Sequence, residues 1–152
     1  MIPKFRAWDK IRNRISEVER IYIDTKGVRL RDENGEYWRR FDDVILVQST
    51  GLFDVNGKEI FEGDVVKFND AWSEYDYEGY VDGASEGENF TEIIKTENGF
   101  SFGRTKIPES SVFYFLNDEH MKFSEIVKSD DFSMVIVGNI YENPELLEAT
   151  ND

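Results

Sequence analysis

The sequence predicts a mainly β protein in which short strands form a small, strongly curved, SH3-like β-barrel, followed by a short C-terminal helix. Three observations predict this fold: short runs that alternate apolar with polar residues, Asn-Gly turns between the runs, and glycines at their ends. They occur together at residues 48–68, where Asn56-Gly57 favours a type I′ turn, Gly63 separates two apolar runs, and Gly51 and Gly63 are expected to be corners with positive φ. A turn, a strand, a glycine corner and a second strand in so short a segment are typical of small barrels.

The first half of the chain is expected to be a β-meander. In residues 28–31, Val28 and Leu30 alternate with two arginines, which places the apolar and basic side chains on opposite faces of a strand. Asn34-Gly35 supplies a second hairpin turn. Strands are predicted at residues 3–8, 15–24, 28–31, 36–41 and 44–47.

The second half combines strands with an acidic insertion. Residues 69–89 contain seven acidic side chains, three glycines and no lysine or arginine, which predicts an acidic loop with its own mobility. Asn143 can cap a helix and Pro144 suits its first position, so a short C-terminal helix is expected there. Strands are predicted at residues 58–61, 64–68, 90–96, 100–107 and 132–137. Residues 111–116 are aromatic and fit either a strand or a helical turn, of which the strand is favoured.

A length of 152 residues suits a single domain, 1–152, with two candidate lobes: the meander at 1–43 and the barrel at 44–145. The absence of cysteine excludes disulfides and thiolate metal sites and fits a reducing cytoplasm. No apolar run approaches the roughly 20 residues of a membrane span. We therefore expect a cytoplasmic protein that makes no membrane contact.

The net charge of −14 is unevenly distributed. Residues 1–68 hold 13 basic and 13 acidic side chains, whereas residues 69–152 hold 5 and 19. Within the first half, residues 1–40 carry 11 basic against 7 acidic groups. A negative field repels phosphate backbones unless the charges segregate, and the simplest interpretation of the acidic half is solubility.

Four blocks of the sequence resemble the YopX family of phage and prophage proteins. They are residues 4–9 (KFRAWD), 48–52 (QSTGL), 56–66 (NGKEIFEGDVV) and 137–144 (VGNIYENP). The resemblance implies a phage- or prophage-encoded, mostly β protein of no established activity, working in a bacterial host. Residues 69–121 match the family poorly, so the resemblance implies nothing there.

No group of residues predicts catalysis, so we expect the protein not to be an enzyme and to have no catalytic, cofactor-binding or metal-binding residues. His120, the only histidine, lies in a polar stretch, and the phosphate-binding glycine motifs are missing. Asp64 follows Gly63 and is interpreted as an acceptor for backbone N–H groups in the turn. The acidic segment 69–89 offers oxygen ligands for Ca²⁺ or Mg²⁺, but its spacing does not match an EF-hand and a solvated loop is favoured.

The basic first half supplies a candidate interaction face. Arginines and an aromatic ring on one sheet face can hold single-stranded nucleic acid by charge and stacking. The same arginines can instead pair with the acidic second half, which the overall charge favours. The candidate residues are Arg6, Trp8, Arg29, Arg31, Arg39 and Arg40.

Taken together, the sequence predicts a non-enzymatic interaction or regulatory module. Its expected partner is a protein, and a second copy of the chain in a homo-oligomer is one candidate. Two alternatives stay open: nucleic-acid binding through the basic N-terminal face, and DNA mimicry by the acidic second half.

Overall fold

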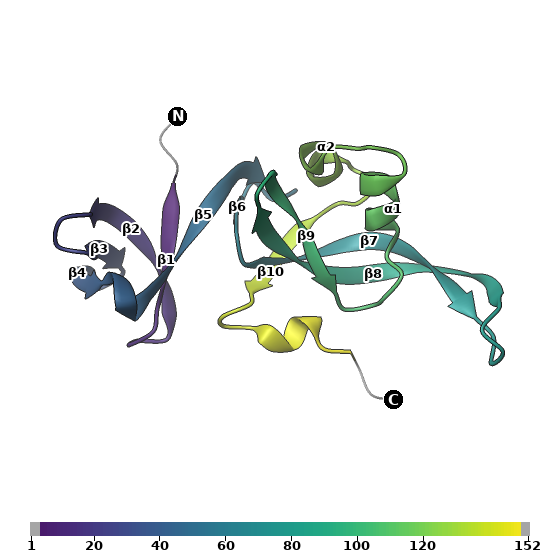
Figure 1. The fold of residues 1–152 in the computed structure, drawn as a ribbon, viewed down its shortest axis with the longest axis horizontal. Coiled ribbons are helices and arrows are strands. Elements are labelled where there is room, and N and C mark those ends of the chain that lie inside the picture. The colour runs from purple at the N-terminus through teal and green to yellow at the C-terminus, as the bar shows by residue number, and fades with distance from the viewer. Residues whose placement is uncertain (1–3, 150–152) are drawn as a thin grey trace.

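The computed structural model describes residues 4–149, and it confirms the mainly β prediction with two antiparallel sheets (Figure 1). The first sheet contains β1 (Phe5–Asp9), β2 (Arg14–Tyr22), β3 (Gly27–Asp32), β4 (Gly35–Arg40), β5 (Val44–Phe53) and β6 (Glu59–Phe61). The second contains β7 (Asp64–Tyr75), β8 (Val81–Thr96), β9 (Gly99–Thr105) and β10 (Val135–Asn139). The strand orders are β4-β3-β2-β1-β5-β6 and β10-β7-β8-β9.

The sheets are open, so the described residues do not form the predicted SH3-like barrel. The outermost strands are β4 and β6 in the first sheet and β10 and β9 in the second. Gly51 and Gly63 do have the left-handed backbone expected of corners, with φ of 77° and 88°. However, the corner at Gly63 passes the chain from β6 in one sheet to β7 in the other, instead of curling one sheet onto itself.

The first four strands form the predicted meander, because each pairs with the next in sequence. β5 then returns to pair with β1 along residues 44–48. The Asn56-Gly57 turn after β5 is not type I′, since Gly57 has a φ of 80° but Asn56 has no positive φ. The Asp54 carboxylate shapes this turn by accepting the backbone N–H groups of Asn56 and Lys58, each at 2.9 Å.

The predicted acidic loop at 69–89 is instead the outer part of the long β7–β8 hairpin. Backbone pairing runs from Val65 opposite Glu92 to Ser73 opposite Ala84, and then to Tyr75 opposite Val81. We call residues 69–89 the arm, which extends away from the rest of the molecule (Figure 1). Because the end of the arm has no core to face, its strands carry no apolar alternation, and the main-chain ladder orders them.

Two short α-helices, α1 (Ser111–Asn117) and α2 (Phe123–Lys128), cover one face of the second sheet (Figure 1). The strand predicted at 111–116 is wrong, because the Ser110 hydroxyl accepts the Val112 N–H at 3.2 Å and caps a helix there. The predicted C-terminal helix begins at Pro144 as expected but is a 3₁₀ helix, Pro144–Leu147. Another 3₁₀ turn, Phe41–Asp43, precedes β5.

The apolar residues form two clusters of different size. The larger one lies between the second sheet, β6 and the helices, and its ten buried members include Phe68, Ile93 and Phe102. The smaller one belongs to the first sheet and has four buried members: Ala7, Val28, Leu30 and Val44. Across residues 4–149, no helix has the length and apolarity needed for a membrane crossing.

Candidate interaction surfaces

The six residues predicted to share one interaction face lie on two faces of the first sheet. Residues directly opposite each other on paired strands share a face, and successive residues alternate. Arg29 lies opposite Trp38, while Arg39 lies opposite the buried Val28. Arg39 therefore lies on the core face, with Ala7 and Leu30. The other five share the outer face: Arg6, Trp8, Arg29, Arg31 and Arg40.

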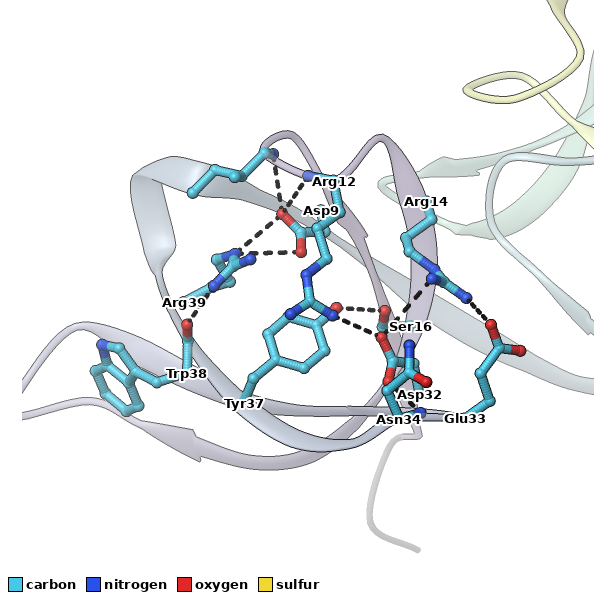
Figure 2. Close-up of polar contacts among 11 residues, drawn as sticks. Asp9, Arg12, Arg14, Ser16, Asp32, Glu33, Asn34, Tyr37, Trp38 and Arg39 are labelled. Atoms are coloured by element: carbon cyan, nitrogen blue, oxygen red, sulfur yellow. Dashed lines mark hydrogen bonds and ion pairs between the residues drawn. The ribbon is translucent and has the colours of Figure 1, made fainter.

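Arg39 belongs to a polar cluster on the core face (Figure 2). Its Nε donates to both carboxylate oxygens of Asp9, at 3.1 and 3.2 Å. Asp9 is fully buried and also accepts the backbone N–H groups of Ile11 at 2.9 Å and Arg12 at 3.3 Å. Burial opposes ionisation of Asp9, but these backbone and guanidinium hydrogen bonds outweigh it and lower the pKa of the carboxyl group.

The same cluster extends through Tyr37 (Figure 2). The guanidinium carbons of Arg12 and Arg39 lie 4.1 and 4.7 Å from the centroid of its ring. Its hydroxyl lies 2.6 Å from the Ser16 hydroxyl, and burial raises the pKa of Tyr37. Arg12 also donates to Asp32 at 2.8 Å. Because its members are already hydrogen-bonded to one another, we interpret this cluster as structural.

On the outer face, acidic residues of the same sheet neutralise three of the predicted arginines. The pairs are Arg6 with Glu17 at 3.2 Å, Arg29 with Glu36 at 3.3 Å, and Arg31 with Glu19 at 2.7 Å and Glu36 at 3.1 Å. The prediction that these arginines pair with the acidic second half is therefore wrong. The hairpin register already places acids of neighbouring strands opposite or diagonal to them.

Arg6 and Trp8 also make contacts at the junction between the two sheets, Arg6 with β6 and Trp8 with the C-terminal segment. The Arg6 guanidinium lies 4.0 Å from the centroid of the Phe61 ring. The Trp8 ring stacks on Tyr141, with centroids 5.7 Å apart and an interplanar angle of 18°. These contacts fasten β6 and the C-terminal segment to β1, and the Tyr141 ring covers one face of Trp8.

A cleft of about 500 Å³ lies at this junction. Asp64, which lines it, is 8% exposed and accepts the Phe61 N–H at 2.8 Å, as predicted for a carboxylate that follows a corner glycine. Burial raises the pKa of Asp64 to about 6, although this hydrogen bond and the charge of Arg6 act in the opposite direction. Three of the four family-like blocks, 4–9, 56–66 and 137–144, supply residues to the cleft, which indicates that they hold the two sheets together.

The end of the arm forms a different surface. Tyr77 is 96% exposed and Tyr80 68% exposed, beside the exposed Tyr75 and Val81. The Asp76 carboxylate accepts the N–H groups of Glu78 and Tyr80, each at 2.9 Å, and so shapes the turn. The acidic side chains here are not grouped as metal ligands, and no cluster of three or more such ligands occurs in the part of the chain that the structure describes.

Two aromatic residues outside the predicted set, Tyr22 and Trp38, also lie on the outer face. Their ring centroids are 5.4 Å apart and their planes are tilted by 51°. Trp38 lies opposite Arg29, and Tyr22 opposite Gly27. The Asn34-Gly35 turn, with the register that it sets, could have placed Trp38 beside Arg29 from the sequence alone.

Comparisons with known proteins extend over nearly the whole chain. The model of a family described as "YopX protein" matches residues 4–148. The crystal structure of protein EF1440 from Enterococcus faecalis is similar, with a TM-score of 0.56 and 27% sequence identity, over 97% of this chain and 99% of that chain. A comparison with curated proteins finds no significant match.

Proposed function

The chain belongs to the YopX protein family, and we propose that it acts as a non-enzymatic interaction or regulatory module that binds a protein partner through the end of the arm. The proposal includes a phage or prophage origin and action in the cytoplasm of a bacterial host, as the family resemblance implies.

The observation that carries this proposal is the exposure of large apolar side chains on a projecting hairpin. Tyr75, Tyr77, Tyr80 and Val81 are all at least 49% exposed, and they lie within seven residues of one another. Tyrosine supplies a large contact area with little loss of side-chain entropy, and it is enriched where interfaces hold most of their binding energy. The long backbone ladder of β7 and β8 keeps Tyr77 and Tyr80 away from the body of the molecule, whereas the Tyr75 hydroxyl donates to Glu109 at 3.4 Å.

The charge of the arm defines the chemistry of the partner. Residues 69–89 contain seven acidic side chains and no basic one. Complementary charge speeds association and selects among partners more than it strengthens binding. We therefore infer a partner with a basic surface that surrounds an apolar depression able to take a tyrosine ring.

The test is affinity capture from a bacterial lysate with three versions of the chain. The wild type is compared with the double variant Tyr77→Ser/Tyr80→Ser and with a matched control, Ile11→Ser/Ile23→Ser. The control removes side chains that are 59% and 73% exposed, in the turns that follow β1 and β2. We expect a basic protein to bind the wild type and the control but to be lost from the arm variant. With the purified partner, the arm variant should lose about 2 kcal/mol or more of binding free energy.

Capture of the same proteins by all three versions would contradict a role for the arm. If the captured partner binds nucleic acid and added DNA displaces it from the chain, the arm acts as a DNA mimic, which is the acidic alternative. If the captured partner is a second copy of the chain, the arm acts in self-association. The nucleic-acid alternative loses most of its predicted face, because Arg6, Arg29, Arg31 and Arg39 are already ion-paired.

A further inference from the structure

The outer face of the first sheet carries an aromatic platform at the end farthest from the second sheet. We define the platform as Tyr22 and Trp38. A Cβ atom added to Gly27 would overlap the indole of Trp38, so this ring lies directly against the strand backbone at Gly27. Trp38 nevertheless remains 41% exposed, so part of the indole is open to solvent. Glycine at position 27 is what lets the ring lie in this way.

Three cations surround the platform without neutralising partners. Arg20 and Trp38 both lie opposite Arg29 on neighbouring strands, and Arg40 lies opposite Gly27. Lys26 and Arg40 line a hollow of about 320 Å³ beside Trp38. Arg20, Lys26 and Arg40 are exposed and form no ion pair with any acidic side chain among residues 4–149. In this they differ from Arg31 on the same face, which has two acidic partners.

We propose that this platform binds single-stranded nucleic acid, with bases stacked on Trp38 and Tyr22 and phosphates held by Arg20, Lys26 and Arg40. Stacking on aromatic rings beside a cationic groove is how single strands are bound without sequence preference. In a duplex the faces of the bases are stacked on one another and cannot stack on Trp38 or Tyr22. A duplex would therefore bind only through its phosphates, to the three cations.

The net charge of −14 does not prevent such binding. Residues 1–40 carry 11 basic and 7 acidic groups, a local charge of +4, whereas the acidic arm lies at the opposite end of the long axis (Figure 1). Exposed charges farther apart than a Debye length of about 8 Å are largely screened at physiological salt. The one carboxylate that lines the hollow is Asp42.

The test measures the fluorescence anisotropy of a labelled oligothymidine strand with the full chain. We expect binding whose logarithmic affinity falls with the logarithm of salt concentration with a slope of about −2, as three phosphate contacts on a single strand predict. Trp38→Leu should weaken binding by about tenfold, and Trp38→Phe should restore part of the loss. Asp42→Asn should strengthen binding, since it removes the acid beside Lys26 and Arg40.

The matched pair Arg40→Gln and Arg31→Gln distinguishes binding at this platform from non-specific electrostatic attraction between the basic sheet face and the phosphates. Each variant removes one positive charge from the same exposed face, and neither side chain belongs to the core. Arg40→Gln should weaken binding several-fold more than Arg31→Gln, because Arg31 is already occupied by Glu19 and Glu36. Equal losses in the two variants, equal affinity for a duplex, or no binding by the wild type at low salt would each overturn the proposal.

Discussion

The two sheets of this protein are stabilised by different interactions. The second sheet packs against α1 and α2 in a cluster of ten buried apolar residues, whereas the first sheet's own cluster has four and is joined by the ion-paired cluster around Asp9. Apolar burial changes little with pH or salt, while ion pairs depend on both. One chain therefore contains a region held together mainly by packing and another that depends on charged hydrogen bonds.

The buried aspartates show the same difference. The carboxylate of Asp9 in the first sheet accepts hydrogen bonds from the Arg39 guanidinium and from two backbone N–H groups. Despite burial, these hydrogen bonds lower its pKa. The carboxylate of Asp64, at the start of the second sheet, accepts one backbone N–H, that of Phe61. Burial of this carboxylate raises its pKa to about 6. Acidification should therefore destabilise the first sheet, where Asp9 loses its charge. It should stabilise the junction between the sheets, where the buried Asp64 becomes neutral.

The largest effect is expected from a cavity in the second core. Phe68→Ala should reduce the free energy of unfolding by about 3–5 kcal/mol, because Phe68 is 1% exposed and packs near Phe132 in the cluster of ten buried residues. Leu30→Ala, its counterpart in the first sheet, should cost less, since the smaller cluster can collapse more easily. Denaturant titration measures both values. An equal or larger loss in Leu30→Ala would show that the first sheet depends on packing as strongly as the second.

The next effect is expected from removal of the buried cation. Arg39→Met keeps an aliphatic chain over Tyr37 but leaves the Asp9 carboxylate unpaired, which should cost about 2–4 kcal/mol at neutral pH. The pKa of Asp9 is lowered in the folded protein, so its stabilisation is present above the unfolded value near 3.8 and is lost as pH falls through the folded value. The difference between wild type and variant should therefore shrink on acidification.

Arg31→Met is the control for this measurement. The Arg31 side chain is 56% exposed, and exposed ion pairs contribute about 1 kcal/mol or less. If Arg31→Met lost as much unfolding free energy as Arg39→Met, burial would not be the reason that the Arg39–Asp9 ion pair stabilises the protein.

A smaller effect with the opposite pH dependence is expected at Asp64. Its folded pKa of about 6 lies above the unfolded value of 3.8, so the folded state holds a proton that the unfolded state has released between these pH values. Stability linked to this group is complete below about pH 4 and is lost as pH rises through 6, by about 1–3 kcal/mol. Asp64→Asn keeps an acceptor for Phe61 and has no charge to bury, so relative to wild type it should gain stability between pH 4 and 7. Parallel pH profiles for the two proteins would contradict the raised pKa.

The sequence predicted correctly those features that depend on neighbouring residues in the chain. The meander of β1 to β4 follows from alternating residues, the corner glycines at 51 and 63 have positive φ, and Asp64 accepts a backbone N–H as expected. Each of these depends on neighbours within a few positions.

The features that the sequence did not predict depend on long-range pairing. The arm is ordered by a ladder between strands whose side chains lack an apolar pattern, so residues 69–89 resembled a loop. In α1, the aromatic residues favoured a strand, whereas the Ser110 cap and the burial of Val112 against the second core select a helix. The partners of Arg29 and Arg31 follow from hairpin register, which overall charge does not show.

The smallest effect compares the two corner glycines and tests how firmly the two sheets are joined. Both have positive φ, so Gly63→Ala and Gly51→Ala should each cost about 1–2 kcal/mol from backbone strain. A Cβ at Gly63 would also lie 3.0 Å from Tyr141, whose ring stacks on Trp8, whereas nothing lies within 4 Å of one at Gly51. Gly63→Ala should therefore cost more in thermal unfolding, and the excess measures the resistance of the Tyr141–Trp8 contact to displacement. Equal losses would mean that the Tyr141–Trp8 contact yields freely when Gly63 gains a Cβ, and that the joint between the two sheets rests on the shared packing of β6 in the larger core.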